Sequence, residues 1–338
     1  MASTASTRWF QIAASVGASA FFLWLALKGE DWNQIAVGLS DARYEYLGAM
    51  FVIGVYALFV RTQRWRLLLA AATSRPQPLG PLFSASAIGF MANMVLPLRV
   101  GEFIRPYLAS RSTGVPLSTV LATAVIERVL DLLTLVVFGL YVITQADVPP
   151  IVRQLTMVAA VVMVVALAGV LAIQSQRARL VPRLDALWAR LPEKLGSTLI
   201  AVEHDFLDGM EVIGNPLVFV KALAWSLYVW LVIAAGFAFG FPATSIDIDL
   251  VGGGITTTTI VALVVSVPGA PGFVGQFEYG CKLALEQIYG IDGARAVTFA
   301  IVTHAAQFAT QVGLGVVYLL REGLSLGELE RISTEEGA

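Results

Sequence analysis

Three ionisable residues lie close together in an otherwise apolar stretch of the chain, TAVIERVLDLLTLVV. They are Glu127, Arg128 and Asp131. On a helix this spacing places the two carboxylates on one face, with the arginine beside them. Each charge costs about 2.5–3.5 kcal/mol where it faces lipid at the centre of a membrane helix. The triplet therefore predicts a polar interior, in which it either binds part of a polar headgroup or forms a structural ion-pair brace.

A second polar stretch holds the residue types that bind a phosphate. Asn93 is followed by Pro97 and then, where a helix restarts, by Arg99, Glu102 and Arg105. N–H groups at a restarted helix attract anions, and arginine binds a phosphodiester through two parallel hydrogen bonds. We expect Arg99 and Arg105 to hold a phosphate, and Glu102 to position an arginine or to receive a cationic group.

The segment VRTQRWRLLLA carries three further arginines near the end of a predicted helix. Arg64 and Arg66, with Trp65, are typical of a cytoplasmic helix end that reaches the lipid headgroups. Arg61 lies about one turn deeper in the helix. It is therefore the member of this group that we expect to contribute to a binding site.

Glu278 follows a glycine-rich break in the segment VVSVPGAPGFVGQFEYGCKLALEQ. We expect this carboxylate to act as a gate or a counter-charge. Its spacing from Lys282 also permits a simple ion pair within one helix, without any role in binding.

Motifs of familiar enzyme chemistry are missing from the sequence. We find no Walker lysine motif, no dinucleotide-binding turn and no nucleophile elbow. Cys281 is the single cysteine, and the two histidines, His204 and His304, are distant from each other, so no zinc cluster is expected. We therefore expect no metal, no cofactor and no enzymatic activity.

The elements that must position these residues are membrane helices. Of the 338 residues, 57% are hydrophobic and 14% are charged, and the mean hydropathy is +0.76, outside the range of a soluble domain. A membrane-spanning helix needs about 20 apolar residues. The sequence predicts an all-α, polytopic transmembrane bundle with about six spanning helices. These lie near 8–27, 46–70, 116–145, 151–174, 217–241 and 293–321.

Lysine and arginine are unevenly distributed between the predicted spans. They collect in 64–75, 99–111 and 177–194, whereas the connectors 145–150 and 241–249 contain none. Because basic segments remain in the cytoplasm, this pattern predicts a multi-pass protein of the cell inner (cytoplasmic) membrane with both termini cytoplasmic.

Two more apolar regions, near 82–114 and 250–290, are interrupted by proline and glycine. The orientation above requires each region to begin and end on one side of the membrane, so we predict two re-entrant helical hairpins that enter from opposite faces. Free backbone groups are tolerated at membrane depth only where protein covers them or where they line a wet cavity. Both hairpins should therefore face an interior.

The order of the predicted elements repeats along the chain. Residues 1–145 and 146–321 each contain two helices, a broken hairpin and a further helix. Each unit crosses the membrane an odd number of times, so the two units are predicted to insert with opposite orientations. Pro97 begins PLRVG in the first break, and Pro268 begins PGAPG in the second. Paired breaks in two inverted halves are typical of a transporter whose site lies between the repeats.

Two other segments complete the predicted organisation. Near 177–214, leucines recur at helical spacing with basic residues between them. This pattern suits either a helix on an anionic cytoplasmic lipid surface or a connector packed on the bundle. Residues 322–338 are expected to form a cytoplasmic tail.

The ordered motifs together resemble the lysylphosphatidylglycerol synthase transmembrane-region family, over about residues 8–321. The resemblance is carried by Arg61-x-x-Arg64-Trp65-Arg66, Gly89-x-x-x-Asn93-x-x-x-Pro97-x-Arg99-x-Gly101-Glu102-x-x-Arg105, Glu127-Arg128-x-x-Asp131 and Pro271-Gly272-x-x-Gly275-x-x-Glu278. It implies translocation of a lipid, because members of the family include the flippase half of the multiple peptide resistance factor. Since only the tail follows the last predicted helix, we do not expect this chain to synthesise a lysyl lipid.

The combined prediction is a flippase or transporter of a polar-headgroup lipid. The cargo classes are a phospholipid, an aminoacyl-phospholipid or a polyisoprenoid-linked lipid, bound in a central polar cavity. Without an ATPase motif, movement is downhill or coupled to an ion through protonation of Glu102, Glu127 or Glu278.

Two alternatives remain open. One is a membrane-embedded enzyme that modifies a lipid-linked substrate with Glu127 or Asp131 as general base. The other is a membrane anchor for a separate lipid synthase or glycosyltransferase. In every case the expected partners are a membrane lipid and an anionic lipid surface, and no nucleic acid.

Overall fold

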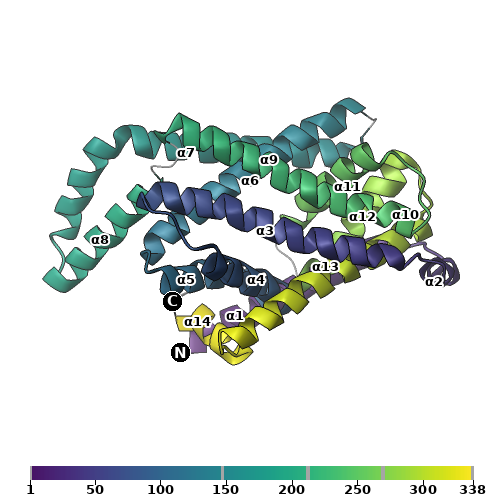
Figure 1. The fold of residues 1–338 in the computed structure, drawn as a ribbon, viewed down its shortest axis with the longest axis horizontal. Coiled ribbons are helices and arrows are strands. Elements are labelled where there is room, and N and C mark those ends of the chain that lie inside the picture. Colours follow the sequence, from purple (N-terminus) through teal and green to yellow (C-terminus); the bar gives the residue numbers. More distant parts are fainter. Residues whose placement is uncertain (1, 146–147, 211–213, 268–270, 336–338) are drawn as a thin grey trace.

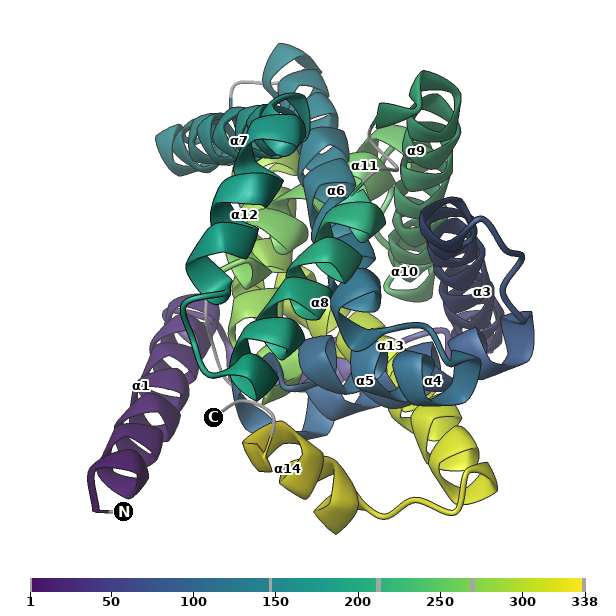
Figure 2. The ribbon, with the colours of Figure 1, turned by 90° about the vertical axis from the view of Figure 1, so that its left-hand side faces the viewer.

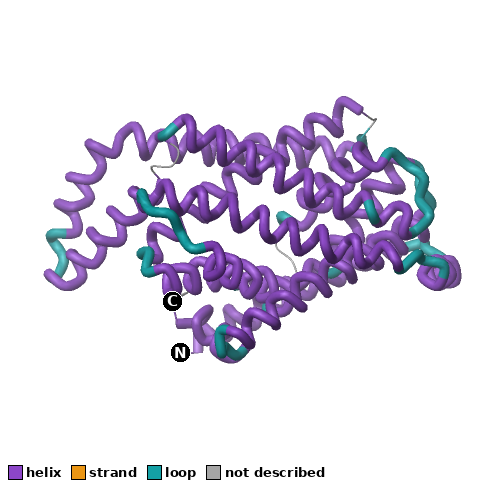
Figure 3. The backbone as a smooth tube through the Cα atoms, viewed as in Figure 1, coloured by secondary structure: helices purple, strands orange, loops and turns teal. Residues whose placement is uncertain are grey.

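The computed structural model describes residues 2–145, 148–210, 214–267 and 271–335. These residues form helices joined by short connections, with no strand among them, which confirms the predicted all-α class (Figures 1 and 3). The helices are α1 (Ala2–Leu27), α2 (Trp32–Ser40), α3 (Glu45–Thr73), α4 (Leu79–Val95), α5 (Gly101–Thr113), α6 (Leu117–Gln145), α7 (Pro150–Trp188), α8 (Glu193–Met210), α9 (Pro216–Ala238), α10 (Gly240–Ala243), α11 (Leu250–Val265), α12 (Gln276–Tyr289), α13 (Gly293–Arg321) and α14 (Leu326–Glu335).

Among the described residues, four helices are long and apolar enough to cross a membrane. They are α3, α7, α9 continued through α10, and α13. All four coincide with predicted spans, and α1 and α6 occupy the positions of the other two, with 26 and 29 residues. The chain is a multi-pass membrane protein built as a polytopic helical bundle.

Two hairpins are broken at their tips by single turns of 3₁₀ helix. α4 and α5 are joined through η1 (Pro97–Arg99), and α11 and α12 through η3 (Pro271–Phe273). α4 ends because Leu96 precedes a proline and adopts an extended backbone with ψ 148°. The predicted hairpins thus span 79–113 and 250–289. Pro268, which begins PGAPG, lies outside the described residues.

The tips of the two hairpins meet inside the bundle. The guanidinium of Arg99, at the first tip, lies 4.9 Å from the ring centre of Phe273 at the second tip. In Figure 1 both termini and the α3–α4 connection lie at one end of the bundle, and α2 and α10 lie at the other. The α4–α5 hairpin lies nearer the first end and the α11–α12 hairpin nearer the second. The inverted relation of the two halves stays a prediction.

α7 and α8 form a long helical hairpin at the end of the bundle that carries the termini (Figure 2). α7 continues from its apolar part into the basic segment near 177–188, and α8 returns to pack on α6. Trp188 Nε1 donates a hydrogen bond to Glu203 Oε2 across this hairpin, at 2.7 Å. The segment predicted near 177–214 is therefore a hairpin packed on the bundle. Its contact with an anionic lipid surface stays a prediction.

The backbones of α4 and α5 approach each other closely at Gly101. A Cβ atom at this position would overlap the carbonyl oxygen of Gly89 and lie 2.6 Å from Asn93 Oδ1. We predict that Gly101→Ala lowers the free energy of unfolding by about 1–3 kcal/mol, the usual effect of an overpacked contact. Gly48→Ala is the matched control, since nothing lies within 4 Å of a Cβ there. Equal thermal unfolding of the two variants in detergent would contradict this packing.

Candidate functional site

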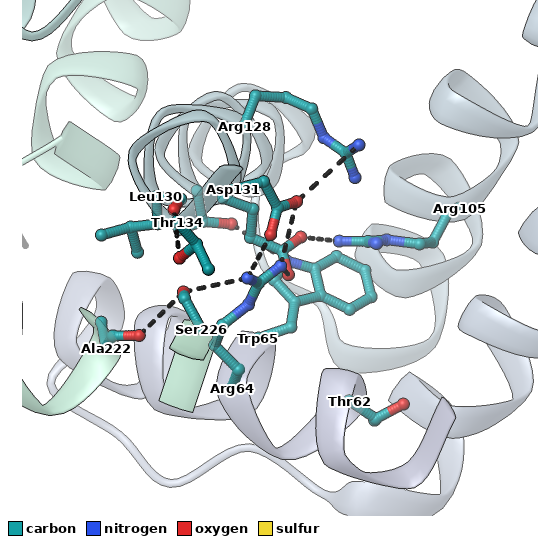
Figure 4. A network of polar contacts seen from close by, with 12 residues as sticks. Thr62, Arg64, Trp65, Arg105, Arg128, Leu130, Asp131, Thr134, Ala222 and Ser226 are labelled. Atoms are coloured by element: carbon teal, nitrogen blue, oxygen red, sulfur yellow. Dashed lines mark hydrogen bonds and ion pairs between the residues drawn. The ribbon is translucent and has the colours of Figure 1, made fainter. Parts of the chain in front are cut away.

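A buried network of charges joins α3 to α6 (Figure 4). Arg64 of α3 pairs with both carboxylates of α6, and its Nη2 lies 3.1 Å from Glu127 Oε1. The side chains of Arg64 and Glu127 are 3% and 1% exposed. Ser226 Oγ accepts a further hydrogen bond from Arg64, and Trp230 Nε1 donates one to Asp131, both at 3.0 Å. α9 is thereby tied to the same network.

Arg105 of α5 completes the network from the first hairpin. It pairs with the second carboxylate oxygen of Glu127, and its guanidinium lies 4.1 Å from the ring centre of Trp65. Trp65 is fully buried and donates a hydrogen bond to Thr123 Oγ1. The expectation that Trp65 anchors the helix at the membrane surface is therefore wrong, because its ring is a support for Arg105.

A more open layer of polar residues lies beside the buried network. Arg128 Nη2 is 3.7 Å from Glu102 Oε2, and Arg128 Nη1 is 3.9 Å from Asp131 Oδ2. Asn93 donates to Glu102 at 3.4 Å. The side chains of Arg128 and Glu102 are 48% and 41% exposed. These two residues are thus the members of the cluster that a ligand can reach without breaking a buried ion pair.

Arg61 is placed differently from the other arginines of the cluster. It lines a cavity of about 130 Å³ between α3, α4, α9, α12 and α13, and its guanidinium lies 5.0 Å from the ring centre of Phe90. Among the described residues it pairs with no carboxylate. The rest of the lining is mainly apolar, with polar groups such as Gln307 and Gln311. The cavity has room for about four waters or a short piece of a larger molecule.

The charges of the cluster do not balance. Within the described part of the chain, the three carboxylates Glu102, Glu127 and Asp131 face the four arginines Arg61, Arg64, Arg105 and Arg128. A positive charge in a weakly polar interior attracts an anion strongly. The excess charge lies at the cavity, because Arg61 is the one of these four arginines that pairs with no carboxylate among the described residues.

Arg99 holds the two hairpin tips together. It donates to the main-chain carbonyls of Val265 and Val267. Its own φ of 53° and that of Leu98, 62°, turn the chain so that Arg99 faces the opposite tip. Arg99 and Arg105 therefore have separate protein partners, and the described structure contains no phosphate pocket shared by them. A binding role for Arg99 stays a prediction.

Glu278 makes its hydrogen bonds at the tip of the second hairpin. Its Oε2 accepts from the backbone N–H of Gly275, and its Oε1 lies 2.6 Å from His304 Nδ1. Lys282 pairs instead with Glu30, in the connection after α1, and with Glu286. The alternative pairing of Glu278 with Lys282 is therefore wrong.

Two residues of the site escaped the sequence interpretation. The helix-end pattern predicts that Arg64 reaches the lipid headgroups, and the sequence suggests no role for His304 once a zinc cluster is excluded. The signal was present in both cases: an ionisable residue inside a predicted membrane helix is by default a candidate for function. Arg64 also follows Arg61 by one turn, so both face the same side of α3.

Comparison with known proteins identifies a matching family and one similar protein. The chain matches the family described as lysylphosphatidylglycerol synthase TM region over residues 12–315. It is also similar to Glycosyltransferase AglD of Haloferax volcanii, with 28% identity over 326 residues that cover 88% of this chain and 52% of that protein. The chain thus spans about half the length of this relative. No solved structure matches it.

The similarity to AglD corrects one expectation from the sequence. A protein that aligns with 88% of this chain is named a glycosyltransferase, so the expectation that the chain has no enzymatic activity is wrong. The expectation depended on missing nucleotide, nucleophile and metal motifs. Acid–base catalysis by a positioned carboxylate needs none of them.

Proposed function

The chain belongs to the lysylphosphatidylglycerol synthase transmembrane-region family, and from this premise we propose that it binds an anionic membrane lipid by its headgroup and moves the lipid across the membrane. One observation carries the proposal. Arg61, which has no carboxylate partner among the described residues, faces a largely apolar cavity beside a cluster with an excess positive charge.

A lipid phosphate supplies what Arg61 lacks. Burying an unpaired charge is costly, and the cost falls when an anion pairs with it. Arginine binds a phosphodiester through two parallel hydrogen bonds, and the apolar lining suits the glycerol and the first methylenes of the lipid. The acyl or isoprenoid chains stay in the bilayer.

The other predicted site residues take different parts in this proposal. Arg128 and Glu102, the half-exposed pair, receive the distal part of the headgroup, with Asn93 holding Glu102. The buried residues Arg105, Glu127 and Asp131 position the cluster and keep the excess charge at Arg61. This division follows their exposure and their pairing.

A second candidate is sugar transfer on a lipid-linked substrate. The similarity to AglD favours it, since that relative is named a glycosyltransferase and is about twice as long as the aligned part. In this case the same cavity binds the phosphate of the lipid carrier. Glu102 is the exposed carboxylate available as a base.

Purified protein in liposomes tests both candidates. The probes are trace NBD-labelled phosphatidylglycerol and NBD-labelled phosphatidylcholine, whose outer-leaflet fraction is bleached by dithionite. Transport predicts faster exchange of the anionic probe, with lipid masses unchanged. Sugar transfer predicts a hexose added to a polyisoprenyl phosphate when nucleotide sugar is supplied. Exchange no faster than in empty liposomes would reject the transport proposal.

We also propose that both termini face the cytoplasm. The ends of the helices flanking the basic segments lie at the same end of the bundle as the termini (Figure 1). Arg75→Cys and Asp247→Cys, both at exposed positions, test this orientation in intact cells with a membrane-impermeant maleimide. We expect labelling at position 247 only. The native Cys281 is fully buried and should stay unlabelled. Labelling at position 75 would reverse the assignment.

A further inference from the structure

His304 and Glu278 form a closed hydrogen-bonded pair at the tip of the second hairpin. His304 Nε2 lies 2.8 Å from the carbonyl oxygen of Gly272, and His304 Nδ1 lies 2.6 Å from Glu278 Oε1. The second oxygen, Oε2, accepts from the N–H of Gly275 at 2.6 Å. Both side chains are 9% exposed. The pair is thus buried and has a partner at every polar atom.

These contacts fix the number of protons in the pair. A carbonyl oxygen only accepts hydrogen bonds, so Nε2 carries a hydrogen. A second hydrogen lies between Nδ1 and Oε1, because two lone pairs do not approach to 2.6 Å. Either an imidazolium faces a carboxylate, or a neutral imidazole faces a carboxylic acid. Both descriptions contain one proton more than a neutral histidine beside an ionised glutamate.

Loss of this proton must open one contact. A neutral imidazole has a single N–H, whereas Glu278 and the Gly272 carbonyl are then both acceptors. Both contacts restrain the same turn, in which Gly272, Phe273 and Gly275 have φ values of 66°, 59° and 87°. A backbone in this region keeps its shape only while its surroundings hold it. The proton therefore controls how firmly the second tip is held.

In the described part of the chain, Glu278 is the charged side chain that contacts His304. α4 and α11 carry no charged residue, nor does α1 over residues 15–27. On α12, the ammonium of Lys282 is held by Glu30 and Glu286, and the buried thiol of Cys281 faces Glu278. The remaining charges on three surrounding elements are Lys221 of α9, Arg295 and Arg321 of α13, and Arg99 of η1. α3, which packs against α13, carries Glu45, Arg61, Arg64 and Arg66; of these, Arg61 lines the cavity and Arg64 is held by Glu127 and Asp131.

Two phenylalanines connect the pair to the cavity and to the first hairpin. The ring of Phe277 stacks on His304 with ring centres 4.3 Å apart, and Phe277 also lines the cavity that contains Arg61. On the other side, Phe273 lies beneath Arg99 of the first tip. A change at His304 is thus one residue away from the cavity proposed for the headgroup and close to the contact between the hairpins.

We propose that the proton shared by His304 and Glu278 is the ion whose binding and release drive lipid movement. This inference rests on the proposed lipid transport and adds its energy source. With the proton bound, the second tip is closed against the first. When the proton leaves for the aqueous phase, one of the two contacts opens and the tips separate.

A pH gradient across proteoliposomes tests the coupling. The probe is NBD-labelled phosphatidylglycerol, and valinomycin with equal potassium on both sides holds the membrane potential at zero. One proton per lipid predicts a final leaflet asymmetry of about tenfold per pH unit. We expect H304Q and E278Q to abolish the asymmetry. H204Q is the matched control, because His204 pairs with Asp185 on the distant α7–α8 hairpin and should leave the asymmetry unchanged.

The outcomes separate the two proposals. If the wild-type protein exchanges lipid but leaves it symmetric at every gradient, the proton proposal is overturned and lipid transport stands. If it exchanges no lipid, both fail. Should a variant not fold, as judged by gel filtration, the gradient response of the wild-type protein still decides between these results.

Nitrogen NMR of histidine-labelled protein tests the proton site without any transport. The chain has two histidines, so in H204Q the remaining histidine signals come from His304. We expect a hydrogen on Nε2 and a second hydrogen shared between Nδ1 and Glu278. In E278Q the glutamine amide donates to Nδ1, so under the same conditions Nδ1 should carry no hydrogen. A hydrogen that stays on Nδ1 in E278Q, or a wild-type Nε2 without a hydrogen, would overturn the shared proton.

Discussion

Arg64→Ala is expected to lower the free energy of unfolding by about 3–5 kcal/mol, since removing one partner of a buried ion network leaves the others uncompensated. Asp131 loses its buried cation, Glu127 keeps only Arg105, and Ser226 loses its donor. Denaturant or thermal unfolding in detergent measures the effect. Arg75→Ala removes an exposed arginine that follows the same helix and should change stability by no more than about 0.5 kcal/mol.

A double-mutant cycle distinguishes the network from a general effect of truncation. Arg64→Met with Asp131→Asn removes the charges from both partners, so the pair should destabilise by less than the sum of the single changes. Strict additivity would show that Arg64 and Asp131 do not interact in solution. Glu127 is a poor probe of transport for the same reason, because it is buried between Arg64 and Arg105 and its loss should reduce the amount of folded protein before any transport is measured.

Unlike Arg64→Ala, Arg61→Ala should have a large effect on lipid movement and little effect on stability. A hydrogen bond to a charged group contributes about 1.5–3 kcal/mol, so exchange of NBD-labelled phosphatidylglycerol should fall by about 10–150-fold. Stability should not fall, because Arg61 pairs with no carboxylate among the described residues. Arg61→Lys keeps the positive charge without the planar guanidinium group and should recover part of the exchange rate.

The preference between lipids provides the sharper measurement. Arg61→Ala should slow the anionic probe much more than the phosphatidylcholine probe, whose headgroup carries no net charge. Arg75→Ala should leave both rates unchanged. If the Arg61 variant retained the wild-type preference for phosphatidylglycerol, the assignment of Arg61 to the headgroup would be wrong.

Much of the architecture could be predicted because membrane burial makes local signals strong. Glu127 and Asp131 had to share a helix face and avoid lipid, and both lie in the buried network. Pro97 and Gly101 predict a break in the helix, and α4 ends at Val95, just before this break. These conclusions needed only helix geometry and the cost of exposing polar groups to lipid.

The partners of each charge could not be predicted in the same way. Arg61 and Arg64 share a face of α3, so only the positions of α6 and α9 decide that Arg64 meets the carboxylates. Arg99 was expected at a phosphate, but a left-handed backbone at the tip directs it to carbonyls on the other hairpin. Such choices depend on contacts between segments far apart in the chain, which a single sequence does not encode locally.

The long separation in sequence between contacting residues constrains how the protein is made. Asp131 receives one of its hydrogen bonds from Trp230, 99 positions later, and the carbonyl partners of Arg99 are 166 and 168 positions later. At roughly 5–20 residues per second, a ribosome needs on the order of 10–30 s to supply the second set. During that interval Asp131 and Glu127 already have Arg64 and Arg105 as partners, whereas the guanidinium of Arg99 lacks its carbonyl acceptors. Water or another molecule must therefore solvate Arg99 until the second hairpin is in place.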